Sequence, residues 1–326
     1  MTVNAYPGYL EKYKSGELAK TADELYKMLG RCSICPRACK VNRLNNELGY
    51  CKTGIKPKVF SYIAHRGEEP PISGINGSGT IFFSNCNMRC VYCQNYEFSQ
   101  IGQGREVDFA ELAKIMLTLQ EEGCHNINFV SPTHCLPQIL KGLLLAIPQG
   151  LNIPLVYNTG GYELAQIIKR LEGIVDIYLP DMRYGEAESA RLYSDAPDYP
   201  EYNRLAVKEM HRQVGLANID KEGIINKGLI IRHLVLPNDV SGTKKVMQFI
   251  ADELSTKTYI SLMSQYLPYY QASQFKDISR RLTEKEYQAA EEAMEENGLS
   301  NGWIQESYGL ERFAGIHIKP SLKKDG

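Results

Sequence analysis

From residue 79 onward, short runs of β-branched or aromatic residues alternate with longer segments of helical period. This alternation predicts parallel strands joined by crossover helices. The runs are nearly all apolar, which is typical of strands buried on both faces, either between layers of helices or inside a barrel. The sequence therefore predicts an α/β fold of six strand–helix units. The predicted strands span residues 80–83, 126–130, 154–157, 175–179, 229–236 and 259–263.

The segments between these strands carry recognisable helix ends. Asp108 has the position of an N-cap, and an apolar face follows it at helical spacing. Residues 164–171 repeat apolar side chains at intervals of three and four, which predicts a second helix. Thr283 predicts the start of a late helix, and Gly298 predicts its end.

The alternation also indicates how the chain is divided. Residues 1–78 lack it, so we expect an N-terminal appendage there, followed over residues 79–326 by a barrel with a C-terminal helical extension. Barrels carry their sites on the loops at the carboxyl ends of the strands. Residues 181–223 are polar, rich in Tyr and interrupted by prolines, and we expect helical pieces and an irregular loop that covers the mouth.

Composition excludes several classes of protein. With 326 residues, 43% of them apolar and 23% charged, the chain can bury a sizeable core and is neither disordered nor fibrous. A net charge of −1 without a long basic run lacks the footprint of a protein that binds nucleic acid or anionic lipid. The first residues lack a secretory signal, and no apolar run is long enough to span a bilayer, so we expect a cytoplasmic protein.

Nine cysteines in a reducing compartment indicate metal binding or chemistry instead of disulfides. Cys86, Cys90 and Cys93 follow a predicted strand directly, with the spacing C-x3-C-x2-C. Structural zinc normally recruits four ligands in two separated pairs, so a zinc loop would leave one ligand missing. Thiolates favour iron–sulfur clusters, and a cubane with three cysteine ligands keeps one iron free for an outside molecule.

This loop resembles the signature of the radical S-adenosylmethionine (SAM) superfamily, C-x3-C-x-aromatic-C, with Tyr92 at the aromatic position. Its surroundings, F-F-S-N-C-N-M-R-C-V-Y-C-Q-N, are similar to the group related to the pyruvate formate-lyase activating enzymes. The resemblance implies a partial (β/α)6 TIM-like barrel of the radical SAM type. It also implies that the three cysteines hold a 4Fe–4S cluster at which SAM is reductively cleaved to a 5′-deoxyadenosyl radical, which abstracts hydrogen from a substrate.

The resemblance further implies residues that bind SAM, partly through a bound monovalent cation. After the second strand, where the family often has Gly-Gly-Glu, this chain has V-S-P-T-H, in which Ser131 or Thr133 supplies a neutral oxygen. The turns after the next two strands are similar to family motifs, and an arginine on the fifth strand matches one expected near the SAM carboxylate or ribose. These positions are Asn158, Thr159, Asp181 and Arg232.

Each of these residues also has a purely structural interpretation. Asp181 follows a strand and precedes a predicted helix, so it is equally suited to capping that helix. Asn158 and Thr159 precede two glycines and are typical turn formers. Arg232 alternates with large apolar residues, so it must face a polar interior or an ion partner.

A second cysteine group lies in the expected appendage, with the spacing C-x2-C-x3-C-x11-C. Four thiolates are a complete ligand set for structural zinc or for a closed iron–sulfur cluster, and composition does not choose between them. An iron–sulfur cluster would act as an electron relay or an auxiliary catalytic site, whereas zinc would stabilise the fold. The block resembles the N-terminal region of one branch of the activase-like group. Its cysteines are Cys32, Cys35, Cys39 and Cys51.

Two further features bear on the reaction. Glu68 and Glu69 lie between the cysteine groups, and a solvated or barrel-bottom salt-linking loop is preferred there to acid–base work. The resemblance implies activation of a glycyl radical enzyme, with flavodoxin or ferredoxin as electron donor. However, Tyr270 stands where activating enzymes usually have His. The alternatives are radical modification of another protein or a small molecule, and a non-enzymatic zinc-binding interaction protein.

Overall fold

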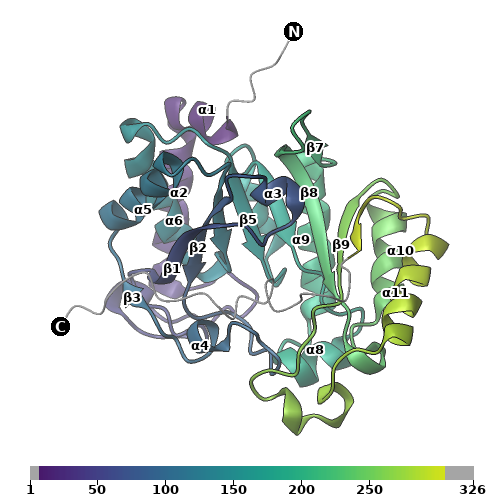
Figure 1. Ribbon diagram of the computed structural model, residues 1–326. Helices are drawn as coiled ribbons and strands as arrows, with labels where there is room; N and C mark the ends of the chain where they lie inside the picture. The colour runs from purple at the N-terminus through teal and green to yellow at the C-terminus, as the bar shows by residue number, and fades with distance from the viewer. Residues whose placement is uncertain (1–6, 305–326) are drawn as a thin grey trace.

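A computed structural model describes residues 7–304 of the chain. Its centre is a sheet in which six parallel strands lie side by side in the order of the sequence (Figure 1). The α/β fold class with a parallel sheet is thereby confirmed, and each strand overlaps its predicted range. The six strands are β2 (Ser78–Phe83), β4 (Ile127–Val130), β5 (Leu155–Thr159), β6 (Ile177–Pro180), β8 (Ile225–Leu234) and β9 (Tyr259–Met263).

Shorter strands extend this sheet on both sides. β1 (Lys58–His65) pairs antiparallel with β2, and β3 (Arg105–Glu106) pairs with β1. On the other side, β10 (Gly302–Ile304) pairs parallel with β9. Part of the expected appendage therefore belongs to the sheet, while the division of the chain at residue 78 stays a prediction. β7 (Asn218–Ile219) pairs with β8 alone.

The helices lie around the strands as the sequence predicts (Figure 1). Asp108 caps the helix after β3 by accepting from the Glu111 backbone N–H at 2.8 Å, and Thr283 forms a capping box at the last helix. The helices are α1 (Gly8–Lys14), α2 (Glu17–Lys27), α3 (Pro70–Ser73), α4 (Tyr96–Ser99), α5 (Phe109–Glu121), α6 (Leu136–Ala146), α7 (Ala165–Ile168), α8 (Ala187–Ser194), α9 (Tyr199–Val214), α10 (Thr243–Glu253) and α11 (Glu284–Glu296).

Short 3-10 turns complete the helical segments. The helix expected over residues 164–171 divides into α7 and one such turn, and residues 181–223 fold into α8 and α9 with a short link. Residues 305–326 of the expected C-terminal extension lie outside the described residues. The 3-10 turns span Met28–Arg31, Arg43–Asn45, Thr133–Cys135, Ile147–Gln149, Lys169–Leu171, Pro237–Asp239, Ala272–Gln274 and Lys276–Ile278.

Strand alternation gives the two faces of the sheet different cores. Successive side chains of a strand point to opposite faces. One face packs against the long helices in a large core that includes Tyr157, Tyr178 and Ile231. The other face holds a smaller apolar cluster, in which Ile72 of α3 packs against Val156 and neighbouring strand residues. The short helix α3 therefore covers part of this face of the sheet.

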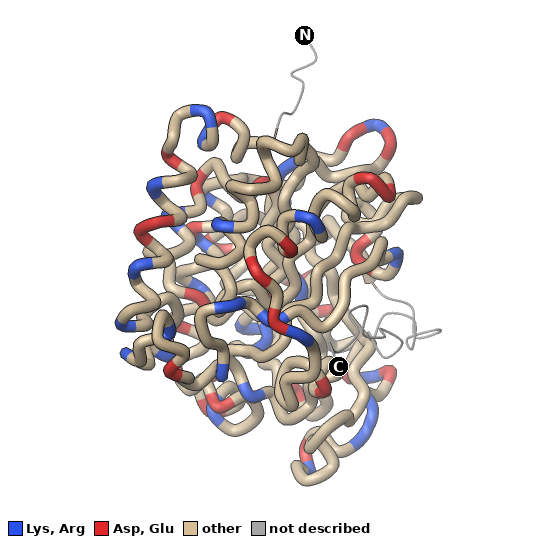
Figure 2. Tube along the Cα trace, turned by 90° about the vertical axis from the view of Figure 1, so that its left-hand side faces the viewer, with Lys and Arg blue, Asp and Glu red and all other residues tan. Residues whose placement is uncertain are grey.

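Charged residues of both signs are mixed along the described part of the chain. Acidic and basic residues are interspersed over the face shown in Figure 2. This mixture agrees with the net charge of −1. Among the helices within residues 7–304, none combines the length and apolar character needed to cross a membrane.

One buried carboxylate links the first helix, α1, to the sheet. Asp176, which precedes β6, accepts from the backbone N–H of Gly8 at 2.8 Å and of Leu155 at 3.0 Å. Burial raises the pKa of Asp176 to about 6. Beside it, the buried Tyr9 donates to the Ile153 carbonyl oxygen at 3.0 Å. These contacts join α1 to the strands β5 and β6.

We expect the substitution Asp176→Ala to destabilise the fold by roughly 2 kcal/mol or more, because it leaves two buried N–H groups without an acceptor. Urea-induced unfolding measures this loss. Asp252→Ala removes an exposed carboxylate of α10 and serves as the control, with an expected change within about 0.5 kcal/mol. Equal unfolding midpoints for the two variants would show that Asp176 does not anchor α1.

Candidate functional site

The cysteine triplet occupies the loop after β2, at the carboxyl end of the parallel strands. Asn85 turns the chain there with a left-handed backbone (φ 72°), which asparagine tolerates better than most residues. Two backbone hydrogen bonds then fix the loop to the end of α8, from Arg89 to the Ser194 carbonyl at 3.1 Å and from Val91 to the Tyr193 carbonyl at 2.9 Å. Residues 181–223, which were expected to cover the mouth, thus hold the cysteine loop in place through α8.

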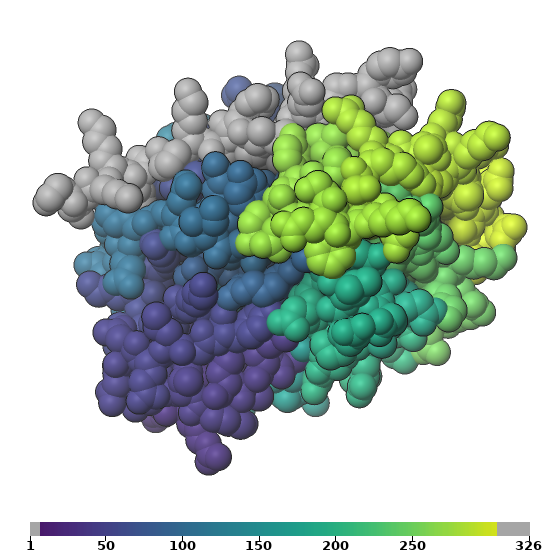
Figure 3. All heavy atoms as spheres, turned by 90° about the horizontal axis from the view of Figure 1, so that it is seen from below, coloured from purple at the N-terminus to yellow at the C-terminus, as the bar shows by residue number. Residues whose placement is uncertain are grey.

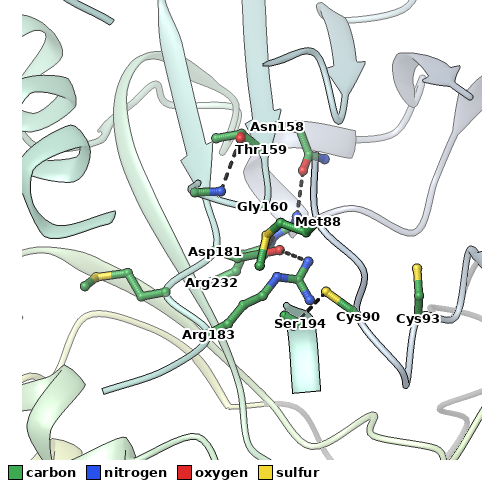
Figure 4. A network of polar contacts seen from close by, with 12 residues as sticks. Met88, Cys90, Cys93, Asn158, Thr159, Gly160, Asp181, Arg183, Ser194 and Arg232 are labelled. Carbon is green, nitrogen blue, oxygen red and sulfur yellow. Dashed lines mark hydrogen bonds and ion pairs between the residues drawn. The ribbon is translucent and has the colours of Figure 1, made fainter. Parts of the chain in front are cut away.

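Each sulfur of the triplet has a hydrogen-bonding partner beside it. The Met88 backbone N–H donates to Cys86 Sγ at 3.4 Å, and the Ser194 hydroxyl donates to Cys90 Sγ at 3.0 Å (Figure 4). Cys93 Sγ lies 3.1 Å from the Ser99 hydroxyl. Such donors stabilise thiolates that bind a metal cluster, so the donor set fits the three-cysteine ligation of a 4Fe–4S cluster.

The three thiols are close enough to affect one another's pKa. Burial and the proximity of Cys90 and Cys93 raise the pKa of Cys86 to about 12. Within residues 7–304, no three His, Cys, Asp or Glu side chains are grouped to hold one metal ion. A cubane distributes its thiolates over different iron atoms, so these thiolates need not meet at one point.

Two strands carry polar residues on the face of the sheet against which Ile72 packs, each after an apolar residue on the same face. Val156 precedes Asn158 by two residues on β5, and Ile230 precedes Arg232 by two on β8. Because residues two apart in a strand share a face, both polar side chains lie on the face that carries the Ile72 cluster. The polar side chains stand nearest the carboxyl ends of these strands.

Arg232 is the centre of the resulting network. Its Nε donates to Asp181 Oδ1 at 2.9 Å, and a terminal nitrogen donates to Asn158 Oδ1 at 2.6 Å (Figure 4). The guanidinium of Arg183 binds the second carboxylate oxygen of Asp181 and extends toward Cys90 in Figure 4. Asn158, Asp181 and Arg232 are thus brought together, and the ion partner expected for Arg232 is confirmed.

A cavity of about 690 Å³ joins this network to the cysteine loop. Cys93 and Tyr92 line it on one side, and Asp181 and Arg232 line it on another. Tyr92 is buried, with its hydroxyl 2.7 Å from that of Tyr184. The cavity is within the common size range of ligand sites and has the mixed polar and apolar walls of such sites.

Glu68 and Glu69 line the same cavity from the loop between β1 and α3. Glu68 Oε2 lies 3.7 Å from Arg232, and the Asn158 amide donates to Glu68 at 3.5 Å. Of the two alternatives that the sequence left open, a solvated loop or a salt-linking one, the ion pair of Glu68 matches the salt-linking one, and the carboxylates are buried. Burial raises the pKa of both side chains, and Arg232 opposes that rise.

The threonines predicted to bind the cofactor lie beside a buried carboxylate instead of lining the cavity. Thr133 and Thr159 both donate to Glu163 Oε1, at 2.5 Å each. Ser131 has a left-handed backbone (φ 55°), and its N–H donates to the Asn158 carbonyl at 2.8 Å. These three residues thus bind Glu163 or the Asn158 backbone, and their contact with a cofactor stays a prediction.

Sequence reasoning missed two charged residues of this region. Glu163 is fully buried, also accepts from the Tyr157 hydroxyl at 3.3 Å, and burial raises its pKa to about 7. A single glutamate after a glycine turn gave no signal. Arg183 did give one, because it stands two residues after Asp181, a spacing that keeps side chains on one side of an extended chain.

The N-terminal cysteines line a small cavity of their own. Cys32, Cys35 and Cys51 are buried, Cys39 is partly exposed, and all four line one small cavity. Backbone hydrogen bonds close the turns between them, including one from Cys32 to the Val41 carbonyl at 2.9 Å. All four cysteines thus line one place, and a metal shared among them stays a prediction.

The two cysteine segments pack directly against each other. The Arg37 side chain donates to the Asn87 carbonyl at 2.9 Å, and Asn85 donates to the Lys52 carbonyl at 3.2 Å. Arg89 also binds the Tyr50 carbonyl and lies over the Tyr50 ring. Viewed from below, the N-terminal segment lies next to the part of the chain that carries the cysteine triplet (Figure 3). Both sites therefore belong to the mouth of the barrel.

Three thiols at the carboxyl end of an α/β sheet, beside a cavity of ligand-binding size, are an arrangement that suits a metal cluster and a small cofactor. The model of the radical SAM superfamily matches residues 80–250. The "Uncharacterized protein MJ0674" of Methanocaldococcus jannaschii is 33% identical over 304 residues, which cover 89% of this chain and 82% of that protein. The chain belongs to the radical SAM superfamily.

Solved structures of similar fold include two enzymes. A crystal structure of HydG, a maturase of the FeFe-hydrogenase, matches 94% of this chain and 68% of its own, with a TM-score of 0.47 and 13% identity. A crystal structure of methylornithine synthase (PylB) matches 76% of this chain and 73% of its own, with a TM-score of 0.44 and 13% identity.

The buried Glu163 gives the stability of the protein a pH dependence. Its folded-state pKa of about 7 exceeds the ordinary value of 4.5, so the unfolded chain loses this proton first as the pH rises. The contribution of Glu163 to the free energy of unfolding is therefore complete below about pH 4.5 and falls as the pH rises to about 7. The total fall is about 3 kcal/mol at most.

We expect Glu163→Gln to remove this loss, so the free energy of unfolding of the variant rises relative to wild type between pH 5 and pH 7.5. Urea unfolding at several pH values measures the difference. Glu121→Gln, at the exposed end of α5, is the control and should run parallel to wild type. A Glu163→Gln variant that also ran parallel to wild type would contradict the assignment.

Proposed function

We propose that this chain cleaves SAM reductively at a 4Fe–4S cluster bound by Cys86, Cys90 and Cys93 and directs the resulting radical at a substrate in the adjoining cavity. The observation that carries the proposal is that the cysteine loop opens on the cavity that holds Asp181 and Arg232. When bound, the reduced cluster supplies one electron that breaks the sulfonium bond of SAM and yields methionine and a 5′-deoxyadenosyl radical, which takes a hydrogen atom from the substrate.

The network below the loop suits the polar end of SAM. Arg232 presents a fixed guanidinium fork for a carboxylate or a ribose hydroxyl. The Asp181 carboxylate and the Asn158 amide oxygen are acceptors for an ammonium group, directly or through a bound monovalent cation. Because this network is already hydrogen-bonded internally, its side chains are oriented before the cofactor arrives.

The cysteine loop rests on a closely packed apolar layer, which suits radical chemistry on its side of the cavity. A second apolar core lies beneath the cysteine loop and includes Met88, Tyr92, Tyr184 and Tyr266. Its residues come from the loop itself, from α8 and from the segment after β9, so distant parts of the chain close the mouth together. A dry site protects a reactive carbon radical from side reactions.

The narrower proposal is that the substrate hydrogen belongs to a glycine of a partner glycyl radical enzyme, with flavodoxin or ferredoxin as electron donor. Support for it comes from the sequence around the triplet. Tyr270, at the position where activating enzymes usually have His, stacks on Tyr96 with ring centroids 5.0 Å apart. Both rings lie next to the cysteine loop, so this replacement alters the mouth where a protein substrate would enter.

Cleavage of SAM is tested with anaerobically purified protein, dithionite and SAM. We expect 5′-deoxyadenosine and methionine in equal amounts, measured by liquid chromatography. Cys90→Ala should reduce both products to background, because the cluster loses a ligand. Cys124→Ala removes a buried core thiol outside both cysteine sites and should leave product formation unchanged. Product formation by the Cys90→Ala variant at the wild-type rate would refute the proposal.

The substrate class is tested separately, because SAM cleavage does not depend on it. Mixing the reduced protein and SAM with a glycyl radical enzyme should generate a glycyl radical signal in an electron paramagnetic resonance spectrum. Deoxyadenosine formation without that signal would exclude this partner and favour radical modification of another protein or of a small molecule.

A further inference from the structure

We propose that Ser194 and Tyr184 set the reduction potential of the cluster at the cysteine triplet, through a chain of buried hydroxyl groups that ends on Cys90 Sγ. The inference rests on the proposed function, because it starts from a 4Fe–4S cluster bound by the triplet. It adds two positioning residues that the sequence of the loop does not indicate, since Ser194 stands 104 positions after Cys90.

The chain consists of three hydroxyl groups that lie within hydrogen-bonding distance of one another. The Ser194 hydroxyl lies 3.0 Å from Cys90 Sγ (Figure 4). The Tyr184 hydroxyl lies 2.7 Å from that of Ser194, and the Tyr92 hydroxyl lies 2.7 Å from that of Tyr184. All four side chains are buried, so these hydrogen bonds act in a medium of low dielectric constant, where they are strong.

A cluster at the triplet gives this chain of hydroxyl groups one direction. A thiolate bound to iron has no proton, so Cys90 Sγ only accepts, and Ser194 donates to it. The Ser194 oxygen then accepts from Tyr184, and the Tyr184 oxygen accepts from Tyr92, because each hydroxyl has a single proton to donate. A phenol has a pKa of about 10, so both tyrosines keep that proton at neutral pH. Three O–H dipoles therefore point toward the sulfur, and hydrogen bonds in such a chain strengthen one another.

The end of α8 places Ser194 against the cysteine loop. Ser194 is the last residue of this helix, and its backbone carbonyl accepts from the Arg89 N–H, while the Tyr193 carbonyl accepts from the Val91 N–H. The carboxyl end of a helix carries partial negative charge, which disfavours an electron added nearby. The Ser194 hydroxyl is a donor at this end of the helix, and it opposes that effect.

Aromatic packing holds the two phenol groups in position. The Tyr184 ring packs edge-on against Tyr199, with ring centroids 5.7 Å apart. The Tyr92 ring packs in a similar way against Tyr266, at 5.8 Å. Neither ring can turn aside without disturbing a closely packed layer. The hydroxyl groups are therefore oriented by the fold.

Donors to a cluster sulfur favour the reduced state of the cluster. Reduction takes one electron from an external reductant, adds one negative charge to the cluster and breaks no bond. A hydrogen bond to the sulfur stabilises the cluster more after this charge is added than before, so the reduction potential rises. The chain at Cys90 thus favours the electron transfer that precedes SAM cleavage.

Arg183 also acts on this sulfur, but a change there would alter the cavity as well. Its guanidinium extends toward Cys90 in Figure 4, pairs with Asp181 and lines the cavity. Tyr92 lines the cavity too, whereas Ser194 and Tyr184 do not. Substitutions at Ser194 and Tyr184 therefore change the surroundings of the sulfur and leave the lining of the cavity intact.

A redox titration tests the proposal without SAM and without an activity measurement. The reduced cluster is followed by electron paramagnetic resonance in anaerobically reconstituted protein. At a fixed applied potential, Ser194→Ala should lower the ratio of reduced to oxidised cluster roughly threefold or more, because the sulfur loses a donor. Tyr184→Phe should shift the ratio in the same direction by a smaller factor, because Ser194 still donates but is no longer polarised by the chain.

Tyr193→Phe is the matched control. Tyr193 precedes Ser194 on α8 and belongs to the same apolar layer, but its hydroxyl donates to Asp277 at 3.2 Å and takes no part in the chain. This variant also loses one phenol hydroxyl, and its potential should equal that of wild type. Iron content and circular dichroism spectra establish that the three variants carry the cluster and are folded.

The outcomes separate this proposal from the proposed function. Wild-type potentials in both Ser194→Ala and Tyr184→Phe would overturn it, and so would an equal shift in Tyr193→Phe. If Ser194→Ala binds less iron than wild type, Tyr184→Phe decides, because phenylalanine keeps the shape of the ring.

The proposed function can fail while this inference stands. Wild-type protein that carries a reducible cluster but makes no deoxyadenosine with dithionite would refute SAM cleavage, and the shifts in potential would still show the effect of Ser194 and Tyr184. Wild-type protein that binds no iron after reconstitution would overturn both.

Discussion

The arrangement of the site depends on how charge is neutralised inside the sheet. Arg232 is an arginine in a strand of large apolar residues, and it is held there by Asp181 and, more distantly, by Glu68. Its partners come from the neighbouring strand end and from the loop before α3, so the ion pairs link elements that are far apart in sequence. The same groups shape the cavity that reaches the cysteine loop, and folding and function therefore use one set of contacts.

Much of this arrangement was predictable because it follows from local spacing. The strand order, the cysteine triplet and the ion partner of Arg232 each depend on a pattern within a few residues, or on the rule that parallel strands share one carboxyl edge. The four N-terminal cysteines line one small cavity, while the metal that their spacing predicts stays a prediction.

The rest depends on contacts that no spacing encodes. Glu163 looks like any surface glutamate in the sequence, and its burial results from strands and loops that meet only in the fold. Glu68 and Glu69 enter the cavity because α3 packs its apolar residue Ile72 onto the inner face of the sheet. Thr133 and Thr159 were predicted to contact the cofactor. In the structure their hydroxyl groups donate to the buried carboxylate of Glu163, which the sequence did not indicate.

The central claim is that the triplet leaves one iron of its cluster open to SAM. Electron paramagnetic resonance of the reduced protein tests this most directly, with SAM labelled by nitrogen-15 in its amino group. The account predicts that SAM changes the cluster spectrum and that the labelled nitrogen shows a hyperfine coupling. A cluster spectrum that excess SAM leaves unchanged would contradict it.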